Sequence, residues 1–124
     1  LQSSDFVRFI TSESTVVRLA GLSGALAISL GAYGAHAIRE AGTFDERRMR
    51  AFDTGNRYHL LHSVALLGAV NARYPWLTAS LFLGGMLVFS GSCYHYSITG
   101  NECLRKYTPV GGLMYIIAWL TLLL

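Results

Sequence analysis

The segment Val16–Ile38 reads VVRLAGLSGALAISLGAYGAHAI and carries one charged residue, Arg18. Its length matches the roughly 20 apolar residues that a helix needs to cross the hydrocarbon core of a bilayer. Further apolar stretches follow it in the chain: Tyr58–Ala72, Trp76–Ile98 and Pro109–Leu124. Because the bilayer core holds no water, the backbone of such segments must pair its own N–H and C=O groups. The sequence therefore predicts an all-α fold, an integral membrane four-helix bundle.

Composition supports a lipid environment for most of the 124 residues. Hydrophobic residues make up 52% of the chain and charged residues 14%, against about 25% charged residues in soluble domains. The expected spans are 16–38, 53–73, 76–98 and 108–124, which together form one transmembrane domain, 16–124. Residues 1–15 are expected to be either a polar tail or a helix lying on the membrane surface.

Lysine and arginine are distributed unevenly between the two ends of the predicted bundle. An even number of spans places both termini on one side, with Arg8, Arg18 and Arg73. The other side carries the remaining basic residues: Arg39, Arg47, Arg48, Arg50, Arg57, Arg105 and Lys106. Basic loops stay on the cytoplasmic side of bacterial membranes, so the first and third loops should face the cytoplasm or the mitochondrial matrix. Since the net charge of +3 lies in loops beside the membrane, nucleic acid is not an expected partner.

The first loop contains a helix start signal. Thr43 and Glu46 have the spacing of a capping box, with Thr43 as the N-cap. This spacing predicts a short interfacial helix through Met49 and Phe52 that turns at Gly55 into the second span. Small residues recur at spacings of three or four within the spans, which indicates close helix packing in lipid. The glycines expected at helix contacts are Gly24, Gly31, Gly84, Gly111 and Gly112.

The histidines fall toward the basic side of the predicted bundle, near the inner ends of the first three spans. With neighbouring tyrosines they form a candidate polar cluster: His36, Tyr58, His59, His62 and Tyr94. His59 and His62 are three positions apart, so they share one helix face. Polar side chains within a membrane are costly, which makes this cluster a candidate for function.

Several roles are open to this cluster. The side chains can hydrogen-bond between helices, or they can bind a quinone, a lipid headgroup or a haem. His36, His59 and His62 offer nitrogens to a metal, but no cysteine or carboxylate is placed to complete the set, so no metal is expected. A proton relay is a further alternative. The chain shows no Ser/His/Asp order, phosphate-binding glycine loop or paired intramembrane carboxylates, so we expect no enzymatic activity and no resident cofactor.

Several motifs resemble a known family in content and order. They are GAYGAH at 31–36, NRYHLLHSVALL at 56–67, FSGS at 89–92 with Tyr94, Thr99-Gly100, and TPVGG at 108–112. Together they resemble the transmembrane protein 256 family, which includes bacterial inner-membrane proteins with a domain of unknown function. His36, His62 and Tyr94 fall on family motif positions, His59 is similar to the eukaryotic branch, and His95 departs from the pattern.

The resemblance implies a small multi-pass membrane protein with no established activity, and eukaryotic members look mitochondrial. A start at Leu1 without an initiator methionine agrees with a processed mitochondrial protein. We therefore expect an accessory or assembly subunit of a larger complex of the mitochondrial inner membrane, with the respiratory chain as the first candidate. Both termini are expected in the intermembrane space.

Overall fold

A computed structural model describes residues 13–42 and 44–124 of the chain. The expectations for residues 1–12 and for Thr43 itself lie outside the described residues. All elements assigned in this part of the chain are helical, which confirms the predicted all-α class. In chain order they are α2 (Thr15–Tyr33), a π-helical stretch (Gly34–Ile38), α3 (Arg39–Ala41), α4 (Glu46–Gly68), a 3₁₀ turn (Ala69–Asn71), α5 (Pro75–Gly85), a second π-helical stretch (Met86–Ser90), α6 (Gly91–Thr99), a 3₁₀ turn (Arg105–Tyr107) and α7 (Thr108–Thr121).

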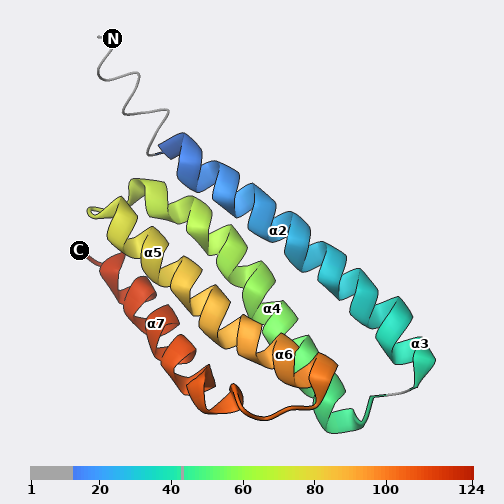
Figure 1. Ribbon diagram of the computed structural model, residues 1–124. Coiled ribbons are helices and arrows are strands. Elements are labelled where there is room, and N and C mark those ends of the chain that lie inside the picture. The colour runs from blue at the N-terminus through green and yellow to red at the C-terminus, as the bar shows by residue number, and fades with distance from the viewer. Residues whose placement is uncertain (1–12, 43) are drawn as a thin grey trace.

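These elements join end to end into four antiparallel helices, and Figure 1 shows how they are arranged. The first runs through α2 and α3, the second is α4, the third runs through α5 and α6, and the fourth is α7. Helix α2 packs on α4, α4 packs on α6, and α5 packs on α7. The turn between α4 and α5 lies at the same end as the C-terminus, and the α3–α4 and α6–α7 loops lie at the other end (Figure 1). We call that second end the loop end.

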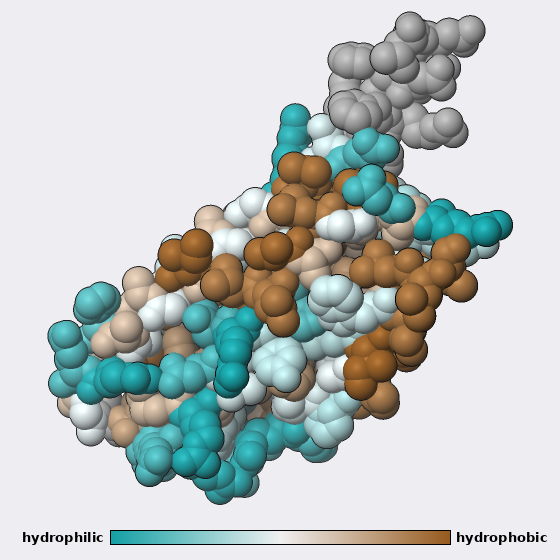
Figure 2. Space-filling model, turned by 180° about the vertical axis from the view of Figure 1, so that it is seen from behind, coloured by the Kyte–Doolittle hydropathy of each residue, from teal (hydrophilic) through white to brown (hydrophobic). Residues whose placement is uncertain are grey.

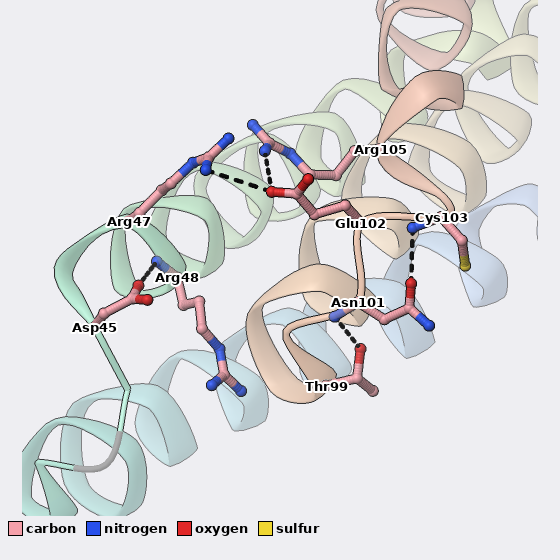
Figure 3. Close-up of polar contacts among 8 residues, drawn as sticks. All are labelled: Asp45, Arg47, Arg48, Thr99, Asn101, Glu102, Cys103 and Arg105. Carbon is pink, nitrogen blue, oxygen red and sulfur yellow. Dashed lines mark hydrogen bonds and ion pairs between the residues drawn. The ribbon is translucent and has the colours of Figure 1, made fainter.

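The start of α4 differs from the expectation. Its N-cap is Asp45, whose carboxylate accepts a hydrogen bond of 2.8 Å from the backbone N–H of Arg48 (Figure 3). The predicted short interfacial helix is not a separate element, because α4 continues without a turn through Gly55 to Gly68. Gly55 is buried against Cys93 of α6, so its missing side chain serves helix packing rather than a turn.

Within the described residues, two helices are long and apolar enough to cross a membrane: Thr15–Ala41 and Pro75–Thr99. The sequence predicted four such spans. Helix α4 has charged residues in its first turns, and α7 has only 14 residues, so neither matches a simple span on its own. Both helices nevertheless expose large apolar side chains, such as Val64 (61%) and Ile116 (56%). Figure 2 shows hydrophobic side chains gathered over much of one face, with hydrophilic side chains mainly toward its two ends.

Glycines allow close approach at several helix contacts. A Cβ at Gly31 would lie 2.8 Å from Oδ1 of Asn56, and one at Gly84 or Gly111 would collide with Met114 or with the backbone of Phe89. Gly24 and Gly112 also lie at helix contacts, but a Cβ there would meet its nearest neighbour at 3.9 or 3.8 Å, an ordinary contact. The glycines that sequence analysis missed as tight contacts are Gly34 against Phe52, Gly55 against Cys93, and Gly85 against Tyr115.

Candidate functional site

The candidate His/Tyr residues divide into two clusters that meet α4 on adjacent sides. We call the first the His59 network; its residues are Ser23, Asn56, His59, Ser63 and Tyr94. We call the second the His62 cluster; its residues are Tyr58, His62, Phe82, Tyr115 and Trp119. The three-residue spacing of His59 and His62 rotates them apart by about 60° around the helix. Each histidine therefore contacts a different neighbouring helix.

The His59 network joins α2, α4 and α6. Nδ1 of His59 lies 2.9 Å from the hydroxyl of Tyr94, and Nε2 lies 3.1 Å from the hydroxyl of Ser23. Asn56 donates from Nδ2 to the carbonyl of Ala27 at 2.7 Å and to the hydroxyl of Tyr94 at 3.1 Å. One imidazole and one amide of α4 thereby bridge the two helices that flank it.

The hydrogen-bond directions in this network follow from the number of protons available. Ser63 donates its one hydroxyl proton to the carbonyl of His59 at 2.7 Å. The proton of Ser23 then goes to Ser63 at 2.6 Å rather than to Sδ of Met86 at 3.2 Å, because a thioether sulfur is a weak acceptor. Ser23 must then accept from Nε2–H of His59, which leaves Nδ1 to accept from the Tyr94 hydroxyl. We assign His59 as the neutral Nε2–H tautomer on this ground.

The His62 cluster joins α4 to α5 and α7. The His62 ring is 2% exposed and stacks on Tyr115 with centroids 3.7 Å apart and planes 12° from parallel. Phe82 and Trp119 meet the same ring at 5.7 and 5.9 Å. Nδ1 of His62 lies 2.7 Å from the Tyr58 carbonyl, which can only accept, and Nε2 accepts from the indole N–H of Trp119 at 3.0 Å. His62 is therefore the neutral Nδ1–H tautomer.

His36 and His95 lie outside both clusters. The side chain of His36 is 77% exposed on the outer side of the first helix, where it lies 3.8 Å from Glu40. His95 has a buried Nδ1 with no hydrogen-bond partner among the described residues. The five candidate residues therefore do not form one site: His59 and Tyr94 meet, Tyr58 and His62 meet, and His36 is apart.

A groove lies over the His59 network between the first and third helices. It has a volume of about 480 Å³. Ser23, His59 and Tyr94 contribute its polar groups, and the rest of its wall is mainly leucine: Leu19, Leu22, Leu26, Leu30, Leu83 and Leu87. An apolar concavity with a few converging polar groups is the common form of a small-molecule site.

The two histidines do not fit axial ligation of a haem or binding of a metal as they are placed. Both ring nitrogens of His59 and of His62 already have hydrogen-bond partners, so no imidazole lone pair is free. Residues 13–42 and 44–124 contain no group of three or more His, Cys, Asp or Glu side chains that could hold a metal ion. The groove over His59 still fits a lipid-soluble molecule that needs no coordinate bond.

Sequence analysis did not single out Ser23, Tyr115 or Trp119 as site residues. Ser23 could have been recognised from the sequence, because it is a polar residue within the first apolar segment. Tyr115 and Trp119 are spaced i and i+4 on α7, which places them on one face. That spacing is equally typical of lipid-facing or core aromatics, so it could not identify His62 as their partner.

The comparisons with known proteins agree on one family. A family model described as a protein of unknown function, DUF423, matches residues 30–112. The chain belongs to the DUF423 family. A UPF0382 membrane protein of Haemophilus influenzae is 32% identical to this DUF423 protein over 109 residues, covering 84% of this chain and 86% of the relative. A UPF0382 membrane protein of Bacillus subtilis is 32% identical over 114 residues, covering 82% and 87%. No solved structure matches the chain.

Family membership supports a small membrane protein in contact with the lipid bilayer, because the relatives are named as membrane proteins. The DUF423 match contains most of the His59 network, but it does not reach Ser23, Tyr115 or Trp119. These relatives are bacterial, so assignment to a eukaryotic branch of the transmembrane protein 256 family stays a prediction.

Proposed function

We propose that this DUF423 protein is a non-enzymatic accessory or assembly subunit that docks on a larger membrane complex through α2. The observation that carries the proposal is a line of small residues on the outward face of α2. These residues are Gly21, Ala25, Ser29 and Ala32, all exposed and spaced three or four apart. Arg18 and His36 mark the two ends of the line, and both are exposed.

This outward line is distinct from the small residues on the side of α2 that packs on α4. Ala20 and Ala27 are buried on the face that packs on α4, whereas a Cβ at Gly21 would meet nothing within 4 Å. In lipid, small residues on a helix face favour association because they let another helix backbone come close. The outward face of α7 lacks this property; it presents large side chains throughout, Val110, Leu113, Ile116, Ile117 and Leu120.

The internal polar groups support a structural role for the rest of the bundle. His59 and His62 are held between helices with both ring nitrogens paired. A general acid or base needs a nitrogen within reach of a substrate proton, and in these two imidazoles each nitrogen already has a hydrogen-bond partner within the bundle.

We further propose the mitochondrial inner membrane as the location and a respiratory-chain complex as the first candidate partner. The support is the concentration of basic residues in the α3–α4 and α6–α7 loops, which suits the matrix side of that membrane. The termini then lie in the intermembrane space.

Native-gel migration of the protein in mildly solubilised membranes tests the docking proposal. We expect wild-type protein to migrate with a large complex and the Ala25→Leu/Ala32→Leu double variant to migrate as free protein. Ser80→Leu is the matched control, because it enlarges an exposed small residue on α5 instead. Wild-type protein that migrates alone, or equal release by Ser80→Leu, would refute docking through α2.

A second candidate function is binding of a quinone or a similar lipid-soluble ring in the groove over His59. The groove favours it because a carbonyl oxygen there can replace Ser23 as the acceptor of Nε2–H of His59. Extraction and mass spectrometry of purified protein test it: a quinone retained by wild-type and lost from Leu26→Trp supports binding. An equal quinone content in both would contradict it.

A further inference from the structure

A second groove lies at the loop end between α4 and α7, and Phe89, Cys93 and Tyr96 of the third long helix also line it. Deeper in the bundle, aromatic rings such as Tyr58, His62 and Tyr115 fill the space between these helices. Toward the loop end the facing residues become small: Ala51 and Thr54 on α4, and Thr108 and Gly112 on α7. Because the side chains of α4 and α7 at this end are too small to fill the space between the two helices, a groove of about 640 Å³ is left.

Arginines line the outer part of this groove. Arg47 and Arg105 approach one carboxylate, that of Glu102, at 3.4 and 3.2 Å, and Figure 3 shows them on either side of it. One carboxylate shared between two guanidinium groups leaves an excess positive charge. Arg50 also lines the groove, and its carboxylate partner is the largely exposed Glu46.

The ring of Tyr96 holds two of these guanidinium groups over the groove. The guanidinium carbon of Arg105 lies 4.5 Å from the ring centroid, and that of Arg47 lies 5.7 Å from it. Guanidinium groups donate paired hydrogen bonds in a geometry that matches phosphate oxygens. The N-terminus of α7 at Thr108 and Pro109, which has no side-chain cap, adds partial positive charge to the same wall.

The inner wall of the groove is apolar. Phe89, Pro109 and Gly112 line it on the side that leads from the loop end toward the middle of the bundle. An apolar wall does not stabilise a free anion, whereas it can pack against an acyl chain. The order of groups, arginine at the membrane surface and apolar wall below, matches the order of phosphate and acyl chain in a phospholipid.

We propose that this groove binds one anionic phospholipid, with an acyl chain along Phe89 and Gly112. Its phosphate lies on the groove side of Arg47 and Arg105 and accepts from guanidinium N–H groups other than those that meet Glu102. Basic pockets between membrane helices on the matrix or cytoplasmic side are suited to such headgroups. The proposal is independent of docking through α2, because the groove lies on other helices.

Lipid titration of the purified full chain in a neutral detergent tests the proposal. We expect dioleoylphosphatidylglycerol to raise the midpoint of thermal unfolding and to remain bound in native mass spectra. Dioleoylphosphatidylcholine and inorganic phosphate at the same concentration should do neither. An equal effect of phosphatidylcholine would overturn the role of headgroup charge, and an equal effect of phosphate would indicate a free-anion site instead.

Two variants locate the binding. Arg47→Gln/Arg105→Gln should weaken phosphatidylglycerol binding by about tenfold or more, since it removes charge-assisted hydrogen bonds to the phosphate. Arg39→Gln/Arg57→Gln removes the same net charge from exposed positions outside the groove and should leave affinity within about twofold. Equal weakening by the two double variants would refute this groove as the site.

Gly112→Leu tests the apolar half of the site without changing charge. A Cβ at Gly112 meets Phe89 at an ordinary 3.8 Å, and Gly112 lines the groove, so a larger residue at this position narrows the apolar half of the site. We expect the variant to unfold at the wild-type temperature in detergent alone and to lose most of the stabilisation by phosphatidylglycerol. Full stabilisation of a normally folded Gly112→Leu protein would contradict placement of the acyl chain.

Discussion

Replacement of His62 by leucine tests how much the His62 cluster contributes to the free energy of unfolding. The substitution leaves the indole N–H of Trp119 without its acceptor and removes the ring stacked on Tyr115. A hydrogen bond between membrane helices contributes about 0.6 kcal/mol on average and about 1.7 kcal/mol at most. A stacked aromatic pair contributes about 0.5–1.5 kcal/mol beyond its buried area. We therefore expect His62→Leu to lower the free energy of unfolding by about 1–3 kcal/mol.

Unfolding by sodium dodecyl sulfate in mixed micelles measures this quantity, with circular dichroism as the signal. Val64→Ala is the control on the same helix, because Val64 is 61% exposed toward lipid and should have little effect. His62→Gln keeps a donor and an acceptor, so its free energy of unfolding should lie between those of wild-type and His62→Leu. A double-mutant cycle with Trp119→Phe should give a coupling energy of about 0.6–1.7 kcal/mol.

A coupling energy near zero would refute the hydrogen bond from Trp119 to His62. Loss of a bound chromophore or metal from a normally folded His62→Gln protein would refute the structural role of His62 altogether. The ligand-binding alternative would then be favoured, because glutamine cannot replace imidazole as a haem ligand.

Other predictions concern packing, capping and orientation. Gly31→Leu should destabilise the bundle by about 1–3 kcal/mol and Leu30→Ala by less, because a side chain at Gly31 meets Asn56; equal losses of folded protein in the same unfolding assay would show that the α2–α4 contact is misplaced. Asp45→Ala should cost about 1 kcal/mol through loss of the α4 N-cap, and Asp45→Asn much less, as unfolding titrations can verify. In mitoplasts, added protease should remove a tag fused after Leu124 and spare one inserted after Gly42; the reverse result would invert the proposed orientation.

Hydrophobic patterning was sufficient to predict the all-α class, because a segment in lipid must be apolar and must satisfy its own backbone. It did not predict that α4 begins at Glu46, since the first turns of that helix are charged. Local signals were less reliable at the first loop. The Thr43–Glu46 spacing suggested one N-cap, whereas Asp45 caps α4 two residues later. Thr43 and Asp45 lie two positions apart there, and both are residue types that cap helix starts. Small differences in loop geometry select among them, and a linear pattern does not contain that geometry.

Amino-acid composition and hydrophobic spacing were enough to predict a lipid environment, the helical class and the residues able to make polar contacts in the membrane. They did not predict which of those residues contact one another, because the rotation of each helix and the identity of its neighbours depend on packing across the whole bundle. His59 and His62 looked like one cluster along the chain, yet they contact different helices and have different tautomers. Small residues on α2 likewise divide into an inward and an outward line. A helix with 3.6 residues per turn presents small residues spaced three or four apart on more than one side. The side of α2 on which α4 packs becomes the inward one, and the uncovered side becomes the outward one.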